Sequence, residues 1–425
     1  MDRVSDLVAA VAAAPDDDAP RLVYADWLIE RGDPLGELIA LQCALARAEA
    51  TDEMMEGETR AIERERALRR VYEDRWLGPL RAIVEAGWVM RRGFVEHVTA
   101  WRARDFVDHA AEISGRAPLL RSLAIGGDVV LASVPELRAV TTLVLEEAGP
   151  LEAATFHPFV VGQLPAVRRL EYANVTRDRE SAQAIVELPV ELDHLAYCPR
   201  RVVGQEPTKQ DAIPWVLRAI AGRQPRLRSL AVGRCYGLAL DGLDELAGLE
   251  GFAAADCALG GEVAAIPQAV PALASLTIER DQIAADELAR MLGGFVKLRR
   301  LRLRNVGLRD EHAEAIAAHA PATLRRLDVV GNHLGDDGAR TLLGMSQLAR
   351  LDLRRNENVK AALVNEANGQ ARLRYRPELP GVPEDILTDL ARGNKIGAIK
   401  RYREITGLGL ANALHAIERI SDERS

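Results

Sequence analysis

The chain has 425 residues, and at roughly 150 residues per domain this length predicts about three folded units. Its 55 lysines and arginines against 63 aspartates and glutamates leave a formal charge of −8, which disfavours a protein that coats nucleic acid or an anionic membrane over its whole surface. Hydrophobic residues make up 48% and aromatic residues 4%, so we expect large aliphatic cores and exclude disorder throughout.

The sequence shows no targeting or redox signature. No apolar run approaches the roughly 18 residues that span a bilayer, and the first six residues, Met1 to Asp6, lack a signal-peptide profile. We therefore expect a cytoplasmic protein without membrane contact. The four cysteines are far apart and include no Cys-x-x-Cys pair, which favours reduced thiols over a zinc ribbon or a redox dithiol.

The segment from Pro15 to Pro34 has the marks of a helix with defined ends. An aspartate precedes it, Pro20 falls in its first turn, and Gly32 followed by Pro34 ends it. Further helices are expected over 35–49 and 58–76. The three consecutive aspartates at 16–18 favour capping over metal binding, because neighbours at a helix start do not easily converge on one ion.

The stretch from Leu7 to Ala46, with Asp-Asp-Asp-Ala-Pro-Arg-Leu-Val-Tyr-Ala-Asp-Trp-Leu, resembles the bacterial repeat-companion domain. The segments 76–79 and 91–96 resemble the join between that domain and its repeats. The family is known chiefly for preceding leucine-rich repeats, so the resemblance implies architecture and assigns no chemistry. We expect an all-α domain over residues 1–98 that covers the open end of the first strand.

From residue 120 onward the pattern Leu-x-x-Leu-x-Leu recurs in ten copies, which begin at residues 120, 140, 167, 192, 227, 249, 273, 298, 324 and 348. In each copy the second and third apolar residues would lie on the buried face of a short strand, and the residues between them would point outward. Stacked copies with helices between them predict a parallel sheet. A polar stretch over 200–211 is expected to form a surface loop.

The phrase from Leu327 to Ala339 closely resembles the ribonuclease-inhibitor type of leucine-rich repeat. The resemblance implies an α/β solenoid, a horseshoe over residues 99–376 with strands inside and helices outside. This family has Asn or Cys five residues after the central leucine, and the positions that match are Cys235, Cys257, Asn332 and Asn356. Stacked copies would align these side chains in a polar ladder along the solenoid. Asp281 and Val306 occupy equivalent positions, so this ladder is imperfect.

The outward strand positions change character along the predicted concave face. They are small in the middle copies (Ala196, Ala231 and Ala253) and charged in the last three. We take the charged set as the candidate partner site: Arg300, Arg302, Arg304, Arg326, Asp328, Arg350, Asp352 and Arg354. Guanidinium groups suit carboxylates and phosphates, which favours a protein or peptide partner with acidic residues.

The alternative to a partner site is that these charged residues pair with one another, as an internal ladder of ion pairs across neighbouring strands. Asp328 and Asp352 are placed to pair with arginines of neighbouring strands, which would leave little net attraction. Nucleic acid is disfavoured because Tyr375 is the one aromatic residue near the patch, and stacking needs aromatic side chains.

Three prolines mark residues 377–383 as a stiff linker before a small helical domain over 384–425, with helices expected at 383–391, 394–405 and 411–420. The run from Lys395 to Leu410 resembles the helix-turn-helix core of the ribosomal stalk protein's C-terminal domain. In that family the face equivalent to Ile396, Lys400 and Arg403 recruits translational GTPases. Ala411 and Leu414 replace two lysines of that family, so a generic partner-binding module stays the other interpretation.

No catalytic motif was found in the sequence. His312 and His319 lie seven residues apart on one predicted helix, a spacing that favours a solvated outer face over a zinc pair. We predict a non-enzymatic interaction scaffold with no cofactor and no metal, which binds its partner on the concave face. The alternatives are a translation-linked adaptor that engages a GTPase through the C-terminal module, and an activity of the N-terminal domain that depends on Asp26.

Overall fold

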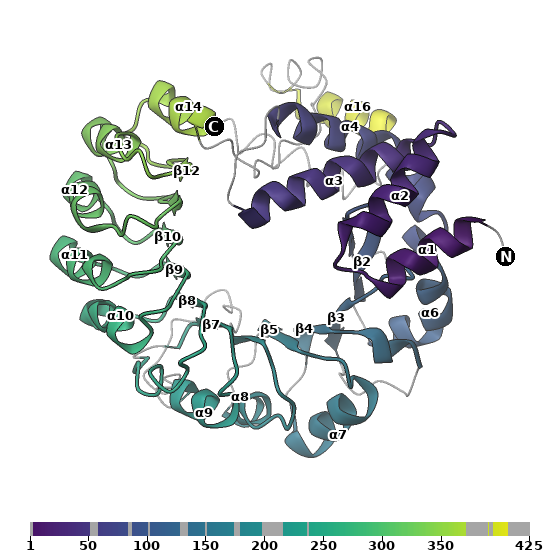
Figure 1. The fold of residues 1–425 in the computed structure, drawn as a ribbon, viewed down its shortest axis with the longest axis horizontal. Helices are drawn as coiled ribbons and strands as arrows, with labels where there is room; N and C mark the ends of the chain where they lie inside the picture. Colours follow the sequence, from purple (N-terminus) through teal and green to yellow (C-terminus); the bar gives the residue numbers. More distant parts are fainter. Residues whose placement is uncertain are drawn as a thin grey trace.

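The N-terminal region forms a helical bundle (Figure 1). The computed structural model describes residues 3–51, 58–83, 87–100, 103–127, 135–148, 151–173, 179–197, 216–235, 238–370, 390 and 394–406. The first helices are α1 (Arg3–Ala13), α2 (Asp18–Ile29), α3 (Pro34–Thr51), α4 (Glu58–Leu77) and α5 (Leu80–Ile83). The three helices expected between residues 15 and 76 are confirmed as α2, α3 and α4.

The start of α2 follows the sequence prediction. The side chain of Asp17 accepts a hydrogen bond from the amide of Ala19 at 2.9 Å, and Gly32 adopts a positive φ of 68° just after the helix. Tyr24 and Leu28 then pack with Ile39 of α3 in a small buried cluster. The same cluster includes Phe94 and Leu119, so the core of the bundle is continuous with the start of the solenoid.

The expectation that residues 1–98 are all helical is wrong. They include β1 (Gly87–Arg91) and most of β2 (Phe94–Ala100), an antiparallel hairpin. Its two-residue turn has positive φ at Arg92 (47°) and Gly93 (84°), the geometry that suits the twist of a tight hairpin. β2 pairs in parallel with β3 (Ser122–Gly127), so β1 covers what would otherwise be the open edge of the sheet.

The ten predicted repeat strands are all present, and with β1 and β2 they form one 12-stranded sheet in chain order. From β2 onward every neighbouring pair is parallel. The strands after β3 are β4 (Thr142–Ala148), β5 (Arg169–Ala173), β6 (His194–Tyr197), β7 (Ser229–Gly233), β8 (Gly251–Ala255), β9 (Ser275–Glu279), β10 (Arg300–Arg304), β11 (Arg326–Asp328) and β12 (Arg350–Asp352).

Helical segments connect these strands and line the outside of the arc, while the strands line the inside (Figure 1). They are α6 (Ala103–Arg116), η1 (Pro135–Ala139), α7 (Ala153–Gln163), α8 (Arg179–Val186), α9 (Val216–Arg223), η3 (Gly260–Ala265), α10 (Ile266–Ala269), α11 (Ala285–Gly293), α12 (Asp310–His319), α13 (Asp336–Leu343) and α14 (Ala361–Gln370). The chain is therefore a curved leucine-rich-repeat solenoid, as the periodicity predicted.

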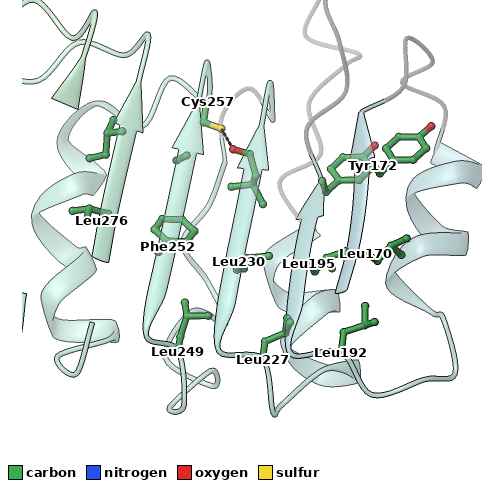
Figure 2. Close-up of a cluster of buried hydrophobic side chains, with 14 of the residues drawn as sticks. Leu170, Tyr172, Leu192, Leu195, Leu227, Leu230, Leu249, Phe252, Cys257 and Leu276 are labelled. Atoms are coloured by element: carbon green, nitrogen blue, oxygen red, sulfur yellow. Dashed lines mark hydrogen bonds between the residues drawn. The ribbon is translucent and has the colours of Figure 1, made fainter. Parts of the chain in front are cut away.

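The core is a continuous row of apolar side chains between the sheet and the helices. Figure 2 shows one such side chain from each of five neighbouring strands, all directed to the same side: Leu170, Leu195, Leu230, Phe252 and Leu276. Each of them is buried, with at most 2% of its surface exposed. Every repeat thus buries its apolar residues only against its neighbours, which is how a solenoid is held together.

A ladder of polar side chains supports the turns after several of the later strands. The oxygen of the Asn332 side chain accepts from the amides of Val306 (2.9 Å) and Leu308 (3.2 Å), and its nitrogen donates to the carbonyl of Leu303 (2.7 Å). The sulfur of Cys257 donates to the carbonyl of Val232, as Figure 2 shows. Cys235 and Cys257, which match the Asn or Cys position of the repeat, are buried in this ladder.

Near the C-terminus, α16 (Lys395–Thr406) confirms the helix expected over 394–405. The loop over 200–211, the linker over 377–383 and the helix expected over 411–420 lie outside the described residues, as does all but residue 390 of the helix expected over 383–391. Among the described helices, none combines the length and the apolar character that crossing a membrane requires.

Candidate interaction surface on the concave face

The sheet brings the predicted charged residues together. Parallel pairing sets Arg300, Arg326 and Arg350 side by side on β10, β11 and β12, and we call these three residues the arginine column. The next outward position holds Arg302, Asp328 and Asp352 in the same register. Because neighbouring strands are only about 4.8 Å apart, like charges in one column repel one another, and such a column costs stability unless negative charge lies near it.

The two aspartates form part of that negative charge. Asp328 lies 3.2 Å from the Arg302 guanidinium and 2.6 Å from that of Arg304, both on the neighbouring strand, while Asp352 lies 2.6 Å from Arg354. The hydrogen bond to Asp328 raises the pKa of Arg304. The internal ladder that the sequence suggested for Asp328 is confirmed. The eight predicted residues comprise six arginines and two aspartates, an excess of four positive charges.

The arginine column also contacts the N-terminal bundle. The main-chain carbonyl of Glu49 accepts hydrogen bonds from Arg326 Nη2 at 2.7 Å and from Arg300 Nη2 at 3.4 Å. Glu49 lies in the last turn of α3, where carbonyls have no partner inside the helix and the helix dipole is negative. Figure 1 shows α3 crossing the mouth of the arc towards the last strands. Local sequence patterns gave no signal for this contact, because the residues are 251 and 277 positions apart.

The middle of the concave face is a floor of small side chains. Ala196, Ala231 and Ala253 stand in register on β6, β7 and β8, as predicted. His194, two residues before Ala196, lies 3.8 Å from Glu171 of β5. Burial, together with the charge of Arg169, lowers the pKa of His194 to about 4, so this imidazole is neutral at pH 7.

The first strands carry a histidine beside a serine. His97 Nδ1 lies 2.7 Å from Ser122 Oγ, and its Nε2 lies 3.1 Å from Thr99 Oγ1. Burial lowers the pKa of His97, so the ring is neutral at pH 7. In a Ser-His-Asp triad the second ring nitrogen donates to a carboxylate, which stabilises the imidazolium that forms during attack. Here a hydroxyl takes that position, so the arrangement is not a triad.

Two of the three aspartates at 16–18 attach the bundle to the solenoid and its hairpin. Asp16 lies 2.8 Å from Arg121, just before β3, and Asp18 lies 3.2 Å from Arg92 in the hairpin turn. The hydrogen bond from Arg121 lowers the pKa of Asp16. Asp17 caps α2, so each carboxylate has an assigned structural partner. Within the described ranges, no three His, Cys, Asp or Glu side chains gather closely enough to hold a metal ion.

Arg21 of α2 is the residue that the sequence interpretation missed at this junction. Its guanidinium is fully buried and lies 2.7 Å from Glu96 of β2. It also donates to the carbonyls of Pro15 at 2.8 Å and Arg92 at 3.1 Å, and it packs over the Phe94 ring. An arginine one turn from other charged residues looks like a surface residue, so only the fold reveals that it is a buried cross-link.

The placement expected for His312 is wrong. His312 is buried, with 5% of its surface exposed, whereas His319 is exposed as expected. His312 Nδ1 accepts from the Arg309 amide at 3.1 Å, and Nε2 lies 3.0 Å from the carbonyl of Ile283 in the preceding repeat. The ring therefore caps the start of α12 and joins two repeats. It faces inward because helices of adjacent repeats stack, so one side of each helix is covered.

A pocket of about 690 Å³ lies at the edge of the solenoid, beside the residues that precede β8 to β11. Its lining includes Glu250, Lys297, Arg299 and Arg325. The Arg325 guanidinium donates to the carbonyls of Ala322 and Gln347, so it supports the rim as well as lining the pocket. The sequence interpretation did not find this pocket, since its lining comes from four separate repeats.

The residues predicted to make contacts in the C-terminal module lie on α16. Ile396 has 82% of its surface exposed, and Lys400, one turn later, is also exposed. Arg403 belongs to the same helix, but its side chain lies outside the described residues. The structure thus places a large apolar side chain and a cation on one exposed face of α16.

Comparison with known proteins gives similarity of fold alone. No family model matches the chain, and no curated protein matches it. Among solved structures, it is similar to TLR13 in the TLR13–ssRNA13 complex, with a TM-score of 0.37 and 16% identity over 56% of this chain and 33% of that chain. This chain thus spans a third of the TLR13 chain.

Two further solved structures are similar at the same level. The internalin InlF of Listeria monocytogenes has a TM-score of 0.34 and 12% identity over 69% of this chain and 92% of that chain. Rad7, from the complex of Rad7 and Elc1 in yeast, has a TM-score of 0.36 and 14% identity over 75% and 82%. Such low similarity carries no inference about function. The solenoid fold rests on the sheet order and repeat register described above.

Proposed function

We propose that this protein is a non-enzymatic scaffold that binds a protein partner through an acidic segment on its concave face. The observation that carries the proposal is the arginine column, three cations in register on consecutive strands. A column of cations attracts an anionic partner and repels a cationic one. Guanidinium groups bind carboxylates through paired donors, so acidic side chains match this surface.

The rest of the concave face supports a partner larger than a single ion. The small side chains on β6 to β8 let a partner's backbone approach the sheet closely, while the arginines lie at one end of the same surface. Charge at the rim of such an interface chiefly sets specificity and association rate, and contact over the floor adds affinity. We therefore place the acidic segment over β10 to β12 and the body of the partner over β6 to β9.

A protein partner is favoured over nucleic acid. Among the described outward positions on β6 to β12, none holds Phe, Tyr or Trp, and the His194 ring is half-buried. Single-stranded nucleic acid relies on stacking against exposed aromatic rings. TLR13 is named in a complex with ssRNA13. Nuclease treatment in the experiment below therefore separates an RNA partner from a protein partner.

The test is affinity capture from cell extract with the full chain, with and without nuclease, read by mass spectrometry. A concave variant, Arg302→Glu with Arg350→Glu, is compared with an outer control, Arg290→Glu with Arg340→Glu on α11 and α13, which changes the net charge equally. The proposal expects a protein that wild type and control retain and the concave variant loses. Equal retention by both variants would refute it, as would loss of the captured species on nuclease treatment.

A second candidate function rests on α16. The exposed Ile396 and Lys400 would suit a partner helix or a GTPase surface, so the module could act as an adaptor linked to translation. If this candidate is correct, Ile396→Asp should abolish capture of that partner while the concave variant leaves the capture unchanged. Retention of the partner by the Ile396→Asp protein would exclude it.

A further inference from the structure

The arginine column is not open in this structure, because the chain's own α3 lies on it. Two guanidinium groups from neighbouring strands, Arg300 and Arg326, converge on one carbonyl oxygen, that of Glu49. The other end of the N-terminal bundle is fixed to the first strands through the Arg21–Glu96 and Asp16–Arg121 ion pairs. The bundle thus joins both ends of the horseshoe, and the contact at Glu49 closes a ring (Figure 1).

The two attachments of the bundle differ in character. The Arg21–Glu96 pair is buried, whereas both hydrogen bonds to Glu49 are exposed. Interactions between exposed groups are weakened by water and by salt, while a buried pair resists separation. The contact at Glu49 is therefore the one that would open first, with the bundle still attached to β2.

We propose that the C-terminal end of α3 is an intramolecular competitor for the arginine column, and that an acidic segment of the protein partner displaces it and opens the ring. This inference rests on the function proposed above and adds its regulation. The Glu49 carbonyl offers only the partial charge of a helix end, whereas a carboxylate offers a full charge and two acceptor oxygens. An acidic partner segment has the chemistry to replace it.

Two substitutions at one position separate competition from other effects. Proline at residue 49 removes an amide and clashes with the preceding turn, so Glu49→Pro should displace the carbonyl and leave the arginines untouched. Glu49→Ala keeps both the helix and the carbonyl, which makes it the matched control. If Glu49→Pro does not fold, Ala50→Pro disturbs the same last turn one residue later and takes its place.

The binding probe is a fluorescein-labelled peptide of acidic residues, a decaglutamate, measured by fluorescence anisotropy with the full chain at low and moderate salt. Competition predicts that Glu49→Pro binds the peptide about tenfold more tightly than wild type, since no fraction of the sites is held by α3. Glu49→Ala should bind as wild type does. Arg350→Glu changes the third arginine of the column and reports whether the column binds the peptide.

The opening is measured separately by the distance between spin labels at Arg47→Cys on α3 and His319→Cys on α12, both exposed positions. The distance should increase in Glu49→Pro and when wild type is saturated with peptide. Equal peptide affinity of Glu49→Pro and wild type, with binding still lost in Arg350→Glu, would overturn the competition and leave the proposed function standing. Absence of peptide binding in every variant would overturn the proposed function and the competition together.

Discussion

The guanidinium of Arg326 on β11 donates a hydrogen bond of 2.7 Å to the main-chain carbonyl of Glu49 at the end of α3, 277 residues earlier. This contact links the N-terminal bundle to the last repeats of the solenoid. It connects the C-terminal end of a helix, where the helix dipole is negative, with the surface that we propose for recognition. Changes at this contact should therefore alter both the shape of the molecule and its access to a partner.

Removal of the Arg326 guanidinium should loosen the ring. Arg326→Gln retains a polar side chain but loses the charge that favours a helix C-terminus, so we expect a larger radius of gyration by small-angle X-ray scattering. The control is Arg290→Gln on α11, because Arg290 forms an ion pair with Asp286 of its own helix. A radius of gyration that both variants share with wild type would show that the contact does not hold the ring closed.

Substitutions at two equivalent positions of the polar ladder should have opposite effects on the free energy of unfolding. Asn332→Ala removes a buried side chain that makes hydrogen bonds to two repeats, and it should lower the free energy of unfolding by about 2–4 kcal/mol. Asp281 accepts from the amides of Cys257 and Leu259, but as a carboxylate it cannot donate as Asn332 does. Asp281→Asn should therefore stabilise the protein at pH 7, by about 1 kcal/mol.

The pH dependence at Asp281 gives this prediction a second readout. Burial raises the pKa of Asp281, so the folded state holds its proton more tightly than the unfolded state does. Stability from this group is present at low pH and is lost as the pH rises through the folded pKa. Chemical unfolding of Asp281→Asn across acidic pH should lack that decline. A variant less stable than wild type at pH 7 would contradict the assignment.

The junction at Arg21 should be among the least tolerant positions of the bundle. Arg21→Met leaves the Glu96 carboxylate buried without its main partner, and removal of one member of a buried ion pair costs about 3–5 kcal/mol. Thermal unfolding should show the loss, and the double variant Arg21→Met with Glu96→Leu should recover part of it. An exposed arginine, Arg64, paired with Glu37 of α3, serves as the control, because Arg64→Met should have little effect.

The lowered pKa of His194 should make the protein lose stability in mild acid. Its folded pKa of about 4 lies below the value of about 6.5 expected for the unfolded chain, so the unfolded state binds the proton first. The stabilisation is complete above pH 6.5 and falls as the pH drops towards 4, by on the order of 2 kcal/mol. His194→Gln should show a smaller decline between pH 6.5 and 4.5 in urea unfolding. Parallel curves for the two proteins would contradict the assignment.

Much of the fold was predictable because each repeat carries its own signal. The alternation around Leu230 or Leu301 fixes a short strand, the spacing fixes the stacking, and Asn332 marks the turn. The helices α2 and α3 were predictable from Asp17, Gly32 and Pro34. The edge strand β1 was not predicted because its alternating pattern of apolar and polar residues is too short to be distinguished from the end of a helix. Its pairing also depends on the parallel sheet beside it.

The candidate site was predictable only in part. Outward positions can be read down the stack, which located Arg302 and Asp328 and their ion pair. The contact between Glu49 and the arginine column could not be read in this way, because it depends on the curvature of the whole solenoid and on how the bundle docks. Arg21 was missed and His312 was misplaced for a related reason, since their burial comes from neighbouring elements and not from their own helix.

Partner binding on the concave face is tested most directly by locating a captured partner on the solenoid. A photo-crosslinking residue is placed at Thr277 of β9, beside Arg302 on the concave face, and in a second protein at Val296, which is 64% exposed beyond the end of α11. After irradiation in extract and nuclease treatment, the account predicts a covalent protein adduct at Thr277 that is absent at Val296 and that excess decaglutamate suppresses. An adduct of that protein formed only at Val296, or one at Thr277 unaffected by the peptide, would contradict the account.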